Sequence, residues 1–191
     1  MNCTIISNNC SGGYLYMDMG AQYLSPTMWT QILPEEYPRF CKNIRHYMEC
    51  EVKEYTEFSE KHRKQIVKHI GMMPDFPCGL IDDVVILFRH YKSFKEAKDK
   101  WDKRKQRIDY KHIIYMFVVE SADNICEAIE FGNQKLPNSI LFTRDFEVDV
   151  PIGHHMYTVP KNSEYLATNQ ITGRRNFEGD FNMIAYIRGM K

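Results

Sequence analysis

The sequence predicts an α/β fold, a three-layer sandwich built on a mainly parallel sheet. Short continuous apolar runs, typical of strands that are buried on both faces, recur along the chain. Between them lie segments with helical spacing of apolar residues and recognisable helix ends. Strands that alternate with helices in this way favour a parallel sheet covered by helices. Since the 191 residues contain neither a linker nor an internal repeat, we expect a single α/β domain over residues 1–191.

The main strands are predicted from four apolar runs that are short and rich in β-branched or aromatic residues. They are Cys3–Ser7, Val84–Phe88, His112–Val119 and Ser139–Thr143. Because Cys3–Ser7 has no polar alternation, we expect it inside the sheet and not at an edge. Weaker patterns predict short strands within Glu51–Phe58 and Met156–Val159.

Helices are predicted where apolar residues recur on one helical face. Four such segments are Pro38–Met48, Lys61–Ile70, Asn124–Phe131 and Phe177–Ile187. Gly71 and Gly132 follow the second and third of these, in the position where glycine commonly ends a helix.

A further helix begins at Ser93, which forms a capping box with Glu96. The apolar stripe of this helix consists of Phe94, Ala97, Trp101 and Ile108. The stripe predicts that Trp101 is buried, whereas Arg104 and Arg107 remain largely accessible.

Charge and cysteine content exclude several classes of protein. Lys plus Arg and Asp plus Glu both total 25, so no net charge recruits nucleic acid, and we expect no nucleic-acid partner. Residues 92–107 nevertheless form a local basic patch, with eight Lys or Arg against three Asp or Glu. The six cysteines include no C-x-x-C pair, and no apolar run approaches the ~20 residues of a spanning helix. We therefore expect a reduced, cytoplasmic protein, with peripheral membrane contact left open.

The segment Ser7–Gly13, with the sequence S-N-N-C-S-G-G, is the most informative part of the chain. It follows the first predicted strand and precedes Tyr14–Met19, so we interpret it as a glycine-bearing turn that leads into a helix. Backbone amides at such a junction form a site for anions. Ordinary tight-turn roles for Gly12, Gly13 and the two asparagines are the alternative.

The ends of the predicted strands assemble a candidate site, because ligands of open parallel sheets bind beyond the carboxyl ends of the strands. The groups delivered there are Ser7–Gly13, His90 and Tyr91, Glu120 and Asp123, and Thr143 and Arg144. The expected substrate-binding residues are Ser7, Asn8, Asn9, Gly12, Gly13, Tyr91, Arg104 and Arg144.

Cys10 and His90, which also lie at the ends of predicted strands, are candidates for nucleophilic catalysis. Cys10 at a helix start is expected to have a lowered pKa and some nucleophilicity, and His90 is the candidate general base. The alternatives are a cysteine that is simply buried and a histidine with a structural hydrogen bond.

Asp82 and Asp83 are candidate ligands for a divalent metal, and Asp83 is also a candidate catalytic base. If Cys78–Ile81 is a short strand, the pair lies at its carboxyl end, where ligands are expected. Otherwise the pair lies at the amino end of Val84–Phe88, away from the expected site. A solvated turn is the alternative, and the need for a metal cofactor stays open. The pair His154-His155 lacks the spacing of a zinc site.

The chain resembles a bacterial family of unknown function that is often labelled exopolysaccharide biosynthesis protein. The segments that carry the resemblance are Thr4–Gly13, Ser25–Thr27, Pro34–Phe40, Gly79–Tyr91, Glu96–Ile108, Leu141–Thr143 and Ile171–Phe177. This resemblance implies a role in making cell-surface polysaccharide, and it assigns no catalytic residue.

Two functions from different classes follow. The first is a transferase-like enzyme that binds an activated, anionic sugar or acyl donor and a saccharide acceptor. An acyl transferase needs Cys10 or Ser7 as nucleophile, whereas a glycosyltransferase needs Asp82 or Asp83 for a metal or as base. The second is a non-catalytic binding or scaffold module of the polysaccharide machinery.

Overall fold

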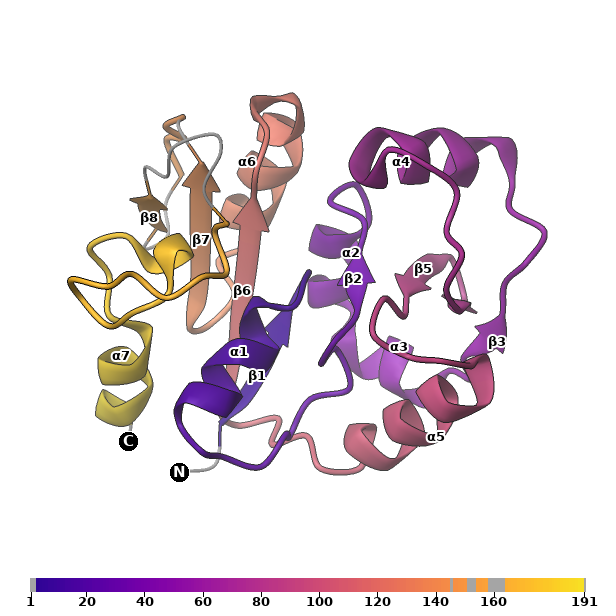
Figure 1. Cartoon of the computed structure of the whole chain (residues 1–191), viewed down its shortest axis with the longest axis horizontal. Coiled ribbons are helices and arrows are strands. Elements are labelled where there is room, and N and C mark those ends of the chain that lie inside the picture. Colours follow the sequence, from indigo (N-terminus) through magenta and orange to yellow (C-terminus); the bar gives the residue numbers. More distant parts are fainter. Residues whose placement is uncertain (1–2, 145, 151–153, 158–163, 191) are drawn as a thin grey trace.

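The α/β class is confirmed by a computed structural model, which describes residues 3–144, 146–150, 154–157 and 164–190 (Figure 1). The described residues form two four-stranded sheets that lie side by side. The parallel sheet has the order β1 (Thr4–Ser7), β6 (Ile113–Val119), β7 (Ser139–Arg144) and β8 (His154–Tyr157). The antiparallel sheet has the order β2 (Gln31–Ile32), β5 (Val84–Leu87), β4 (Cys78–Ile81) and β3 (Lys53–Glu54).

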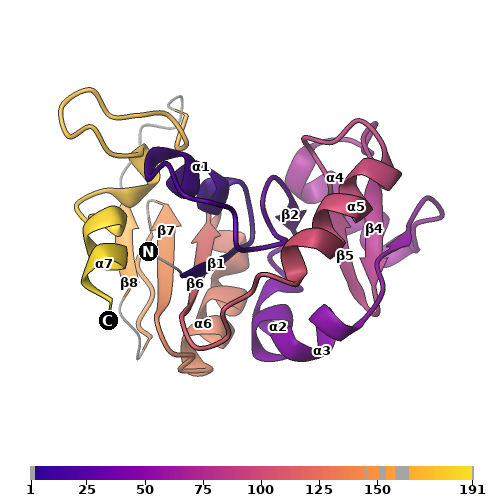
Figure 2. The same cartoon turned by 90° about the horizontal axis from the view of Figure 1, so that it is seen from below.

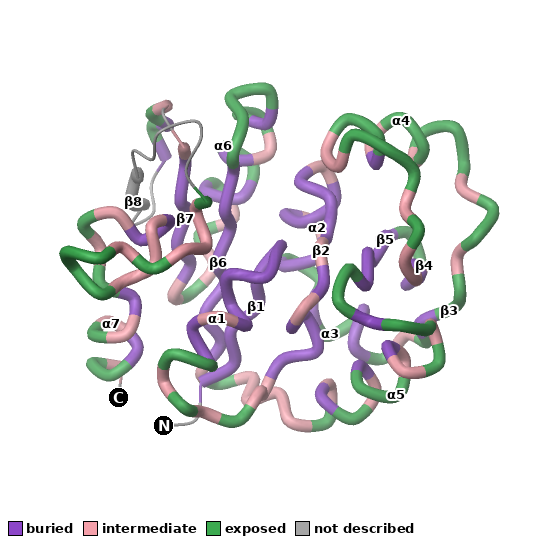
Figure 3. Tube along the Cα trace, in the orientation of Figure 1, coloured by how far each residue is buried: buried purple, intermediate pink, exposed green. Residues whose placement is uncertain are grey.

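Helices cover both faces of the parallel sheet, which gives the three layers expected of the fold (Figure 2). On one face α1 (Ser11–Asp18) and α7 (Met183–Gly189) pack against alternate side chains of the strands. On the other face α2 (Tyr37–Lys42) and α6 (Ile125–Asn133) pack against the remaining side chains. Strands β1, β6 and β7 are buried along almost their whole length (Figure 3), which explains their mostly apolar sequences.

The antiparallel sheet is also covered on both faces. Helix α4 (Glu60–Ile70) packs on one face through Ile66, which contacts a small cluster that includes Val85 and Leu87. On the other face, α3 (Ile44–Glu49) and α5 (Phe94–Lys105) join the main core, which continues into the parallel sheet. The two sheets therefore share one hydrophobic core.

Four expectations about strand partners and helix bounds need correction. The run Val84–Phe88 does form a strand, but this strand belongs to the antiparallel sheet. The segment Pro38–Met48 forms two short helices that are separated at Asn43. The last helix begins at Met183, and Phe177 lies in a separate single turn, Asn176–Glu178.

The fourth correction concerns Gly132, which lies inside helix α6 and does not end it. A Cβ atom at this position would lie 2.5 Å from Cβ of Val150, so close packing accounts for the glycine. The weak patterns within Glu51–Phe58 and Met156–Val159 correspond to the short strands β3 and β8, although residues 158 and 159 lie outside the described residues.

Strand β1 lies at the edge of the parallel sheet and not inside it, although it is fully buried. Two side-chain hydroxyls occupy backbone donors of this strand. The Ile5 N–H donates to the Tyr16 hydroxyl (3.1 Å), and the Ser7 N–H donates to the Thr27 hydroxyl (3.3 Å). Strand β1 can be buried without a second neighbouring strand because these hydroxyls accept the backbone N–H groups on its free edge.

The antiparallel sheet adjoins this edge through β2, where the backbone N–H of Ile32 donates to the Asn8 carbonyl (2.8 Å) just beyond β1. We call this boundary between the two sheets, formed by this contact and the two hydroxyls described above, the seam. The Tyr37 hydroxyl of α2 lies 2.8 Å from the Ile6 carbonyl of β1 and 2.9 Å from the Met116 carbonyl of β6, so it bridges two strands of the parallel sheet.

The capping box at the start of α5 is confirmed in part. The Ser93 hydroxyl accepts the Glu96 N–H (3.2 Å), and the Glu96 carboxylate accepts the N–H of Lys92, one residue earlier than expected (3.3 Å). Trp101 is buried, as the apolar stripe predicts, with 1% of its surface exposed.

Arg104, in contrast, is buried and not accessible. Its guanidinium donates to the Tyr91 hydroxyl (2.7 Å) and to the Met28 carbonyl (3.3 Å) and lies over the Tyr23 ring. The apolar stripe of the helix could not predict that Arg104 is buried, because its three partners lie outside the helix. Arg107 is partly buried and donates to the Tyr23 carbonyl (3.2 Å).

Candidate functional site

A cleft of about 200 Å³ lies at the carboxyl edge of the parallel sheet. The antiparallel sheet and α4 come alongside this edge (Figure 1). The position of the cleft follows the rule for open parallel sheets, whose ligands bind beyond the carboxyl ends of the strands. The lining residues are Asn8, Asn9, Gln31, Pro34, Lys68, His69, Val118, Glu120, Ser121 and Asn124. The cleft thus draws its walls from both sheets and spans the seam.

Asn8 supports the floor of the cleft. Its side-chain amide donates to the Val118 carbonyl (3.0 Å) and accepts the Val118 N–H (2.9 Å). The amide therefore continues the pairing between β1 and β6 for one more position after the backbone of β1 turns away. Both polar atoms of the amide are used in this way, so Asn8 positions the site.

Asn9 shapes the turn from β1 into α1. Its side-chain oxygen accepts the Ser11 N–H (3.0 Å), and its side-chain nitrogen donates to the Tyr165 hydroxyl (3.2 Å). The Ser7 hydroxyl accepts the Asn9 N–H (3.4 Å). The Ser11 N–H at the start of α1 thus already has the Asn9 side-chain oxygen as its acceptor. The anion site expected at this helix start stays a prediction.

Glu120 follows β6 directly, keeps exposed surface at the mouth of the cleft and is its acidic group. Desolvation by the walls raises its pKa, and this effect outweighs the opposing effects of the Tyr165 hydroxyl and of the positive charges at Arg144, Arg89 and His69. A carboxyl group with a raised pKa, in a cleft, is a candidate for proton transfer.

The opposite wall carries an ion-paired cluster at the end of α4. The Nε2 atom of His69 lies 2.8 and 2.9 Å from the two carboxylate oxygens of Glu35, and Lys68 lies 3.3 Å from one of them. Burial would raise the pKa of Glu35, but the hydrogen bonds from His69 and Lys68 lower it to about 2. Glu35 is therefore ionised and holds the two basic groups at the cleft.

Two arginines influence the groups of the cleft. Arg89, just beyond β5, donates to the side-chain oxygen of Gln31 (3.1 Å), which lines the cleft. Arg144 ends β7, and its positive charge lowers the pKa of Glu120. The cleft therefore combines one carboxyl group with amide, hydroxyl and cationic groups.

The structure brings Asn8 and Asn9 to this cleft, as the strand-end rule predicts, whereas Arg144 is not among the lining residues and acts on Glu120 through its charge. Ser7 lies beneath the cleft, fully buried. The expected lowering of the Cys10 pKa is wrong: burial raises the pKa of its thiol to about 11, and the charge of Arg89 offsets only part of this shift. Position at the start of a helix does not lower the pKa here, because desolvation dominates.

His90 and Tyr91 follow β5, so they belong to the antiparallel sheet and do not line the cleft. His90 is exposed, and its ring packs edge-on against that of Trp29, with 5.6 Å between the ring centroids. Partial burial and the charge of Arg89 lower its pKa. Tyr91 is buried, and its hydroxyl donates to the Met28 carbonyl (2.8 Å) and accepts from Arg104, so it has a structural role.

Gly12 and Gly13 lie inside the first turn of α1 and do not form a turn with positive φ. A Cβ atom on Gly12 would lie 3.1 Å from the Ser7 Cβ atom, and one on Gly13 would lie 3.2 Å from the Trp29 ring. The glycines therefore allow α1 to pack closely on β1 and on Trp29.

Asp82 and Asp83 form the turn between β4 and β5, so they do not reach the cleft. The segment Cys78–Ile81 is indeed a strand, but it belongs to the antiparallel sheet. The carboxylate of Asp83 forms an ion pair with Arg39 (3.0 Å) and accepts the Tyr47 hydroxyl (2.8 Å). Its assignment as a base in the candidate site is therefore corrected.

Several residues of the cleft were not predicted as site residues from the sequence. Lys68 and His69 appeared only as part of a basic helix, and Gln31 lay in no predicted element. Their presence depends on how the antiparallel sheet packs beside the parallel one, which no local pattern specifies.

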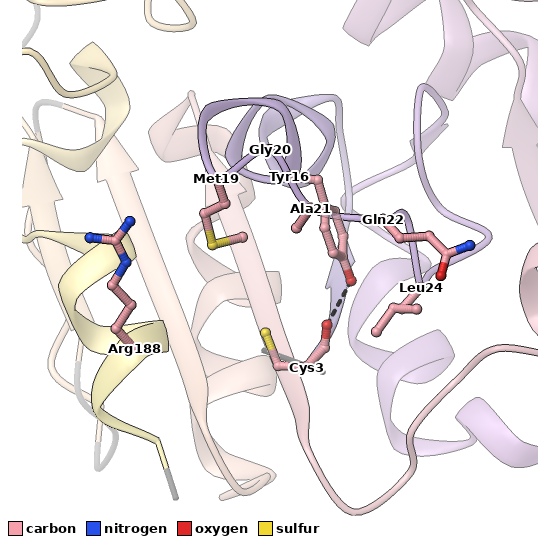
Figure 4. A pocket seen from close by; sticks show the side chains of 8 residues that line it. All are labelled: Cys3, Tyr16, Met19, Gly20, Ala21, Gln22, Leu24 and Arg188. Atoms are coloured by element: carbon pink, nitrogen blue, oxygen red, sulfur yellow. Dashed lines mark hydrogen bonds between the residues drawn. The ribbon is translucent and has the colours of Figure 1, made fainter.

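A larger cavity of about 370 Å³ lies near the amino end of β1 (Figure 4). It is bounded by Cys3, Tyr16, Arg188 and the loop that follows α1. The Tyr16 hydroxyl donates to the Cys3 carbonyl (2.8 Å), which leaves Arg188 as the charged group of the lining. The cavity offers fewer reactive groups than the cleft and lies at the opposite edge of the sheet.

Comparison with known proteins identifies the family. Residues 1–187 match a family that is described as a domain of unknown function, DUF1919. The chain belongs to the DUF1919 family. A protein of Haemophilus influenzae named "Uncharacterized protein" is 24% identical to this DUF1919 protein over 140 residues, which are 73% of this chain and 61% of the relative. The chain thus matches less than two thirds of the relative's length.

Among the described residues of this DUF1919 protein, no helix has the length and apolar character needed to cross a membrane.

Proposed function

We propose that this DUF1919 protein is a glycosyl-transfer enzyme of bacterial surface-polysaccharide assembly, which binds an activated, anionic sugar donor in the cleft. The observation that carries the proposal is the position of Glu120 at the carboxyl edge of the parallel sheet, with a raised pKa and with Arg89 and Arg144 nearby. The link to polysaccharide rests on the resemblance of motifs such as Thr4–Gly13 and Gly79–Tyr91 to the family with that label.

The groups of the cleft suit the chemistry of such a donor. Side-chain amides and hydroxyls at Gln31, Ser121 and Asn124 can hydrogen-bond to the hydroxyl groups of a sugar. The cationic groups of Arg89, Arg144 and Lys68 suit the phosphate oxygens of a leaving diphosphate.

In the proposed reaction, a hydroxyl oxygen of the saccharide acceptor attacks the anomeric carbon of the donor. A new carbon–oxygen bond forms while the bond from the anomeric carbon to the donor phosphate oxygen breaks. Glu120 accepts the proton of the acceptor hydroxyl, and the diphosphate leaves with the bonding electron pair. Because the base must be ionised, the transfer rate should rise with pH through the raised pKa of Glu120.

An acyl-transfer reaction has less support in this geometry. Its nucleophile would be Cys10, whose thiol has a pKa raised to about 11, or Ser7, which is fully buried. The thiols of all six cysteines are free, which agrees with the reducing cytoplasm that we propose as the location.

Binding and transfer can be tested separately. We would titrate the full chain with a panel of nucleotide sugars and the matching nucleoside diphosphates, and follow thermal stability and heat of binding. Transfer to saccharide acceptors would be followed by mass spectrometry. We expect Arg89→Gln to weaken diphosphate binding about tenfold or more, which corresponds to roughly 1.4 kcal/mol.

Glu120→Gln should retain donor binding and lower the transfer rate by about 10²–10⁴-fold, as expected when a general base is lost. Glu130→Gln is the matched control, because Glu130 is exposed on α6 and does not line the cleft. Donor binding without any transfer would favour a non-catalytic binding module, and transfer that does not depend on Glu120 would contradict its role as the base. No binding of any anionic sugar donor would contradict the proposal altogether.

A further inference from the structure

Three potential metal ligands converge on the surface of the antiparallel half of the molecule. They are His46 in α3, Cys50 just after α3, and Asp82 in the turn between β4 and β5. The Nε2 atom of His46 lies 2.9 Å from a carboxylate oxygen of Asp82 and 3.6 Å from the Sγ atom of Cys50. All three ligand atoms lie within 4.8 Å of one another.

The local structure explains why these side chains meet. His46 and Cys50 are four residues apart, so they share one face at the end of α3. Asp82 has a positive φ of 53°, a left-handed conformation that aspartate tolerates in tight turns. The neighbouring Asp83 is bound to Arg39 and Tyr47, which anchors the turn against α2 and α3.

The spacing suits a zinc ion. With Zn–S and Zn–N bonds of about 2.3 and 2.0–2.1 Å, the sulfur and nitrogen ligands of a tetrahedral zinc lie about 3.5 Å apart. The observed separation of Cys50 Sγ and His46 Nε2 is 3.6 Å. The contact between His46 and Asp82 has the length of a hydrogen bond, so this pair would open slightly to admit the ion.

We propose that His46, Cys50 and Asp82 form a zinc site, with a fourth position that is open to water. A thiolate, an imidazole and a carboxylate suit zinc, whereas magnesium and calcium prefer oxygen ligands alone. Binding displaces the thiol proton of Cys50 to solvent, and the zinc–sulfur bond replaces it. All three residues have access to solvent, so the ion can enter without unfolding.

This site is separate from the cleft. Asp82 precedes β5 and Arg89 follows it, so the two groups lie at opposite ends of the strand. None of the three proposed ligands lines the cleft. The ion would tie α3 to the β4–β5 turn, two segments about 30 residues apart in the chain, and the proposal does not depend on glycosyl transfer.

The test uses the full chain after removal of metals with a chelator. Zinc binding would be measured by calorimetry and thermal shift, and cobalt would serve as a spectroscopic substitute whose thiolate charge-transfer absorption reports a cysteine ligand. We expect one strong site and a thiolate band in the wild-type protein. Cys50→Ser should abolish the band, and His46→Ala should weaken zinc binding by more than the roughly 10–100-fold seen on loss of an outer-shell partner.

Cys126→Ser is the matched control, because Cys126 is an exposed free thiol on α6 and is not one of the converging ligands. This variant should retain both the band and the affinity. A wild-type protein without a thiolate band, or equal zinc affinity in wild type and Cys50→Ser, would overturn the proposal. Loss of the band in Cys126→Ser would also overturn it.

Discussion

Replacing Glu36 with glutamine probes a buried carboxyl group beneath α4. The Glu36 side chain has no exposed surface. One carboxylate oxygen accepts the Val85 N–H (2.8 Å), and the other lies 3.1 Å from Nε2 of His62 without forming a hydrogen bond of good geometry. Nδ1 of His62 in turn lies 2.8 Å from the Tyr55 hydroxyl.

Desolvation raises the pKa of Glu36 from 4.5 to about 7, although the Val85 N–H and nearby Lys61 and Arg39 act in the opposite direction. At about 1.4 kcal/mol per pKa unit, the shift corresponds to a cost of about 3 kcal/mol for ionised Glu36 in the folded state. Between pH 4.5 and 7 the folded state binds more protons at this group than the unfolded state. The contribution of Glu36 to stability is therefore fully present below about pH 4.5 and is lost as the pH rises through 7.

Glu36→Gln removes this titration, so the variant should gain about 3 kcal/mol relative to wild type between pH 4.5 and 8. Urea unfolding at several pH values in this range measures the difference. Burial lowers the pKa of His62, which gives an opposite pH dependence, but His62 is present in both proteins and largely cancels in the comparison. A difference that is independent of pH, or that favours wild type as the pH rises, would refute the reasoning, since Glu36 would then be an ionised partner of His62.

Three further substitutions test the packing and the helix starts. Trp101→Ala should lower the free energy of unfolding by about 3–5 kcal/mol in urea titrations, and a wild-type midpoint would mean that Trp101 is not a core residue. Ser93→Ala should cost about 1 kcal/mol in the same assay through loss of the N-cap; no change would show that the cap contributes nothing. Gly12→Ala should destabilise the protein by about 1–3 kcal/mol, because its Cβ would crowd β1 and the Met28 side chain at 3.1–3.2 Å. Gly189→Ala, which has open space around it, serves as the control and should be close to neutral in thermal melts; equal effects of the two substitutions would exclude crowding.

Local signals in the sequence predicted most of the elements correctly. The buried strands were visible as apolar runs because both of their faces are covered, and the Ser93 cap involves only neighbouring residues. The sequence could not show that Val84–Phe88 joins a separate sheet, since an apolar run does not specify its partner strand. Its tight antiparallel connection to β4 depends on the left-handed backbone at Asp82, a residue type that adopts this conformation only occasionally.

The candidate site was predictable where it depends on the parallel sheet alone. The strand-end rule placed Asn9 and Glu120 together, and the structure agrees. It misplaced His90, because the rule was applied to a strand of the other sheet. The apolar stripe of α5 also could not predict the burial of Arg104, since a helical pattern does not show that Tyr91, which precedes the helix, will accept a hydrogen bond from its guanidinium.

The seam has a mechanical consequence for the cleft. Strand β1 has no neighbouring strand on the side of the antiparallel sheet, and side-chain hydroxyls from Tyr16 and Thr27 take the place of a ladder. A single hydrogen bond of this kind contributes only about 1 kcal/mol net, and one backbone bond, from Ile32 to Asn8, crosses beside them. The main hydrophobic core continues from one sheet into the other, so the packing of its side chains, and not a continuous ladder, fixes the separation of the two walls of the cleft. A substitution that loosens this packing is therefore expected to alter the cleft while every strand ladder stays intact.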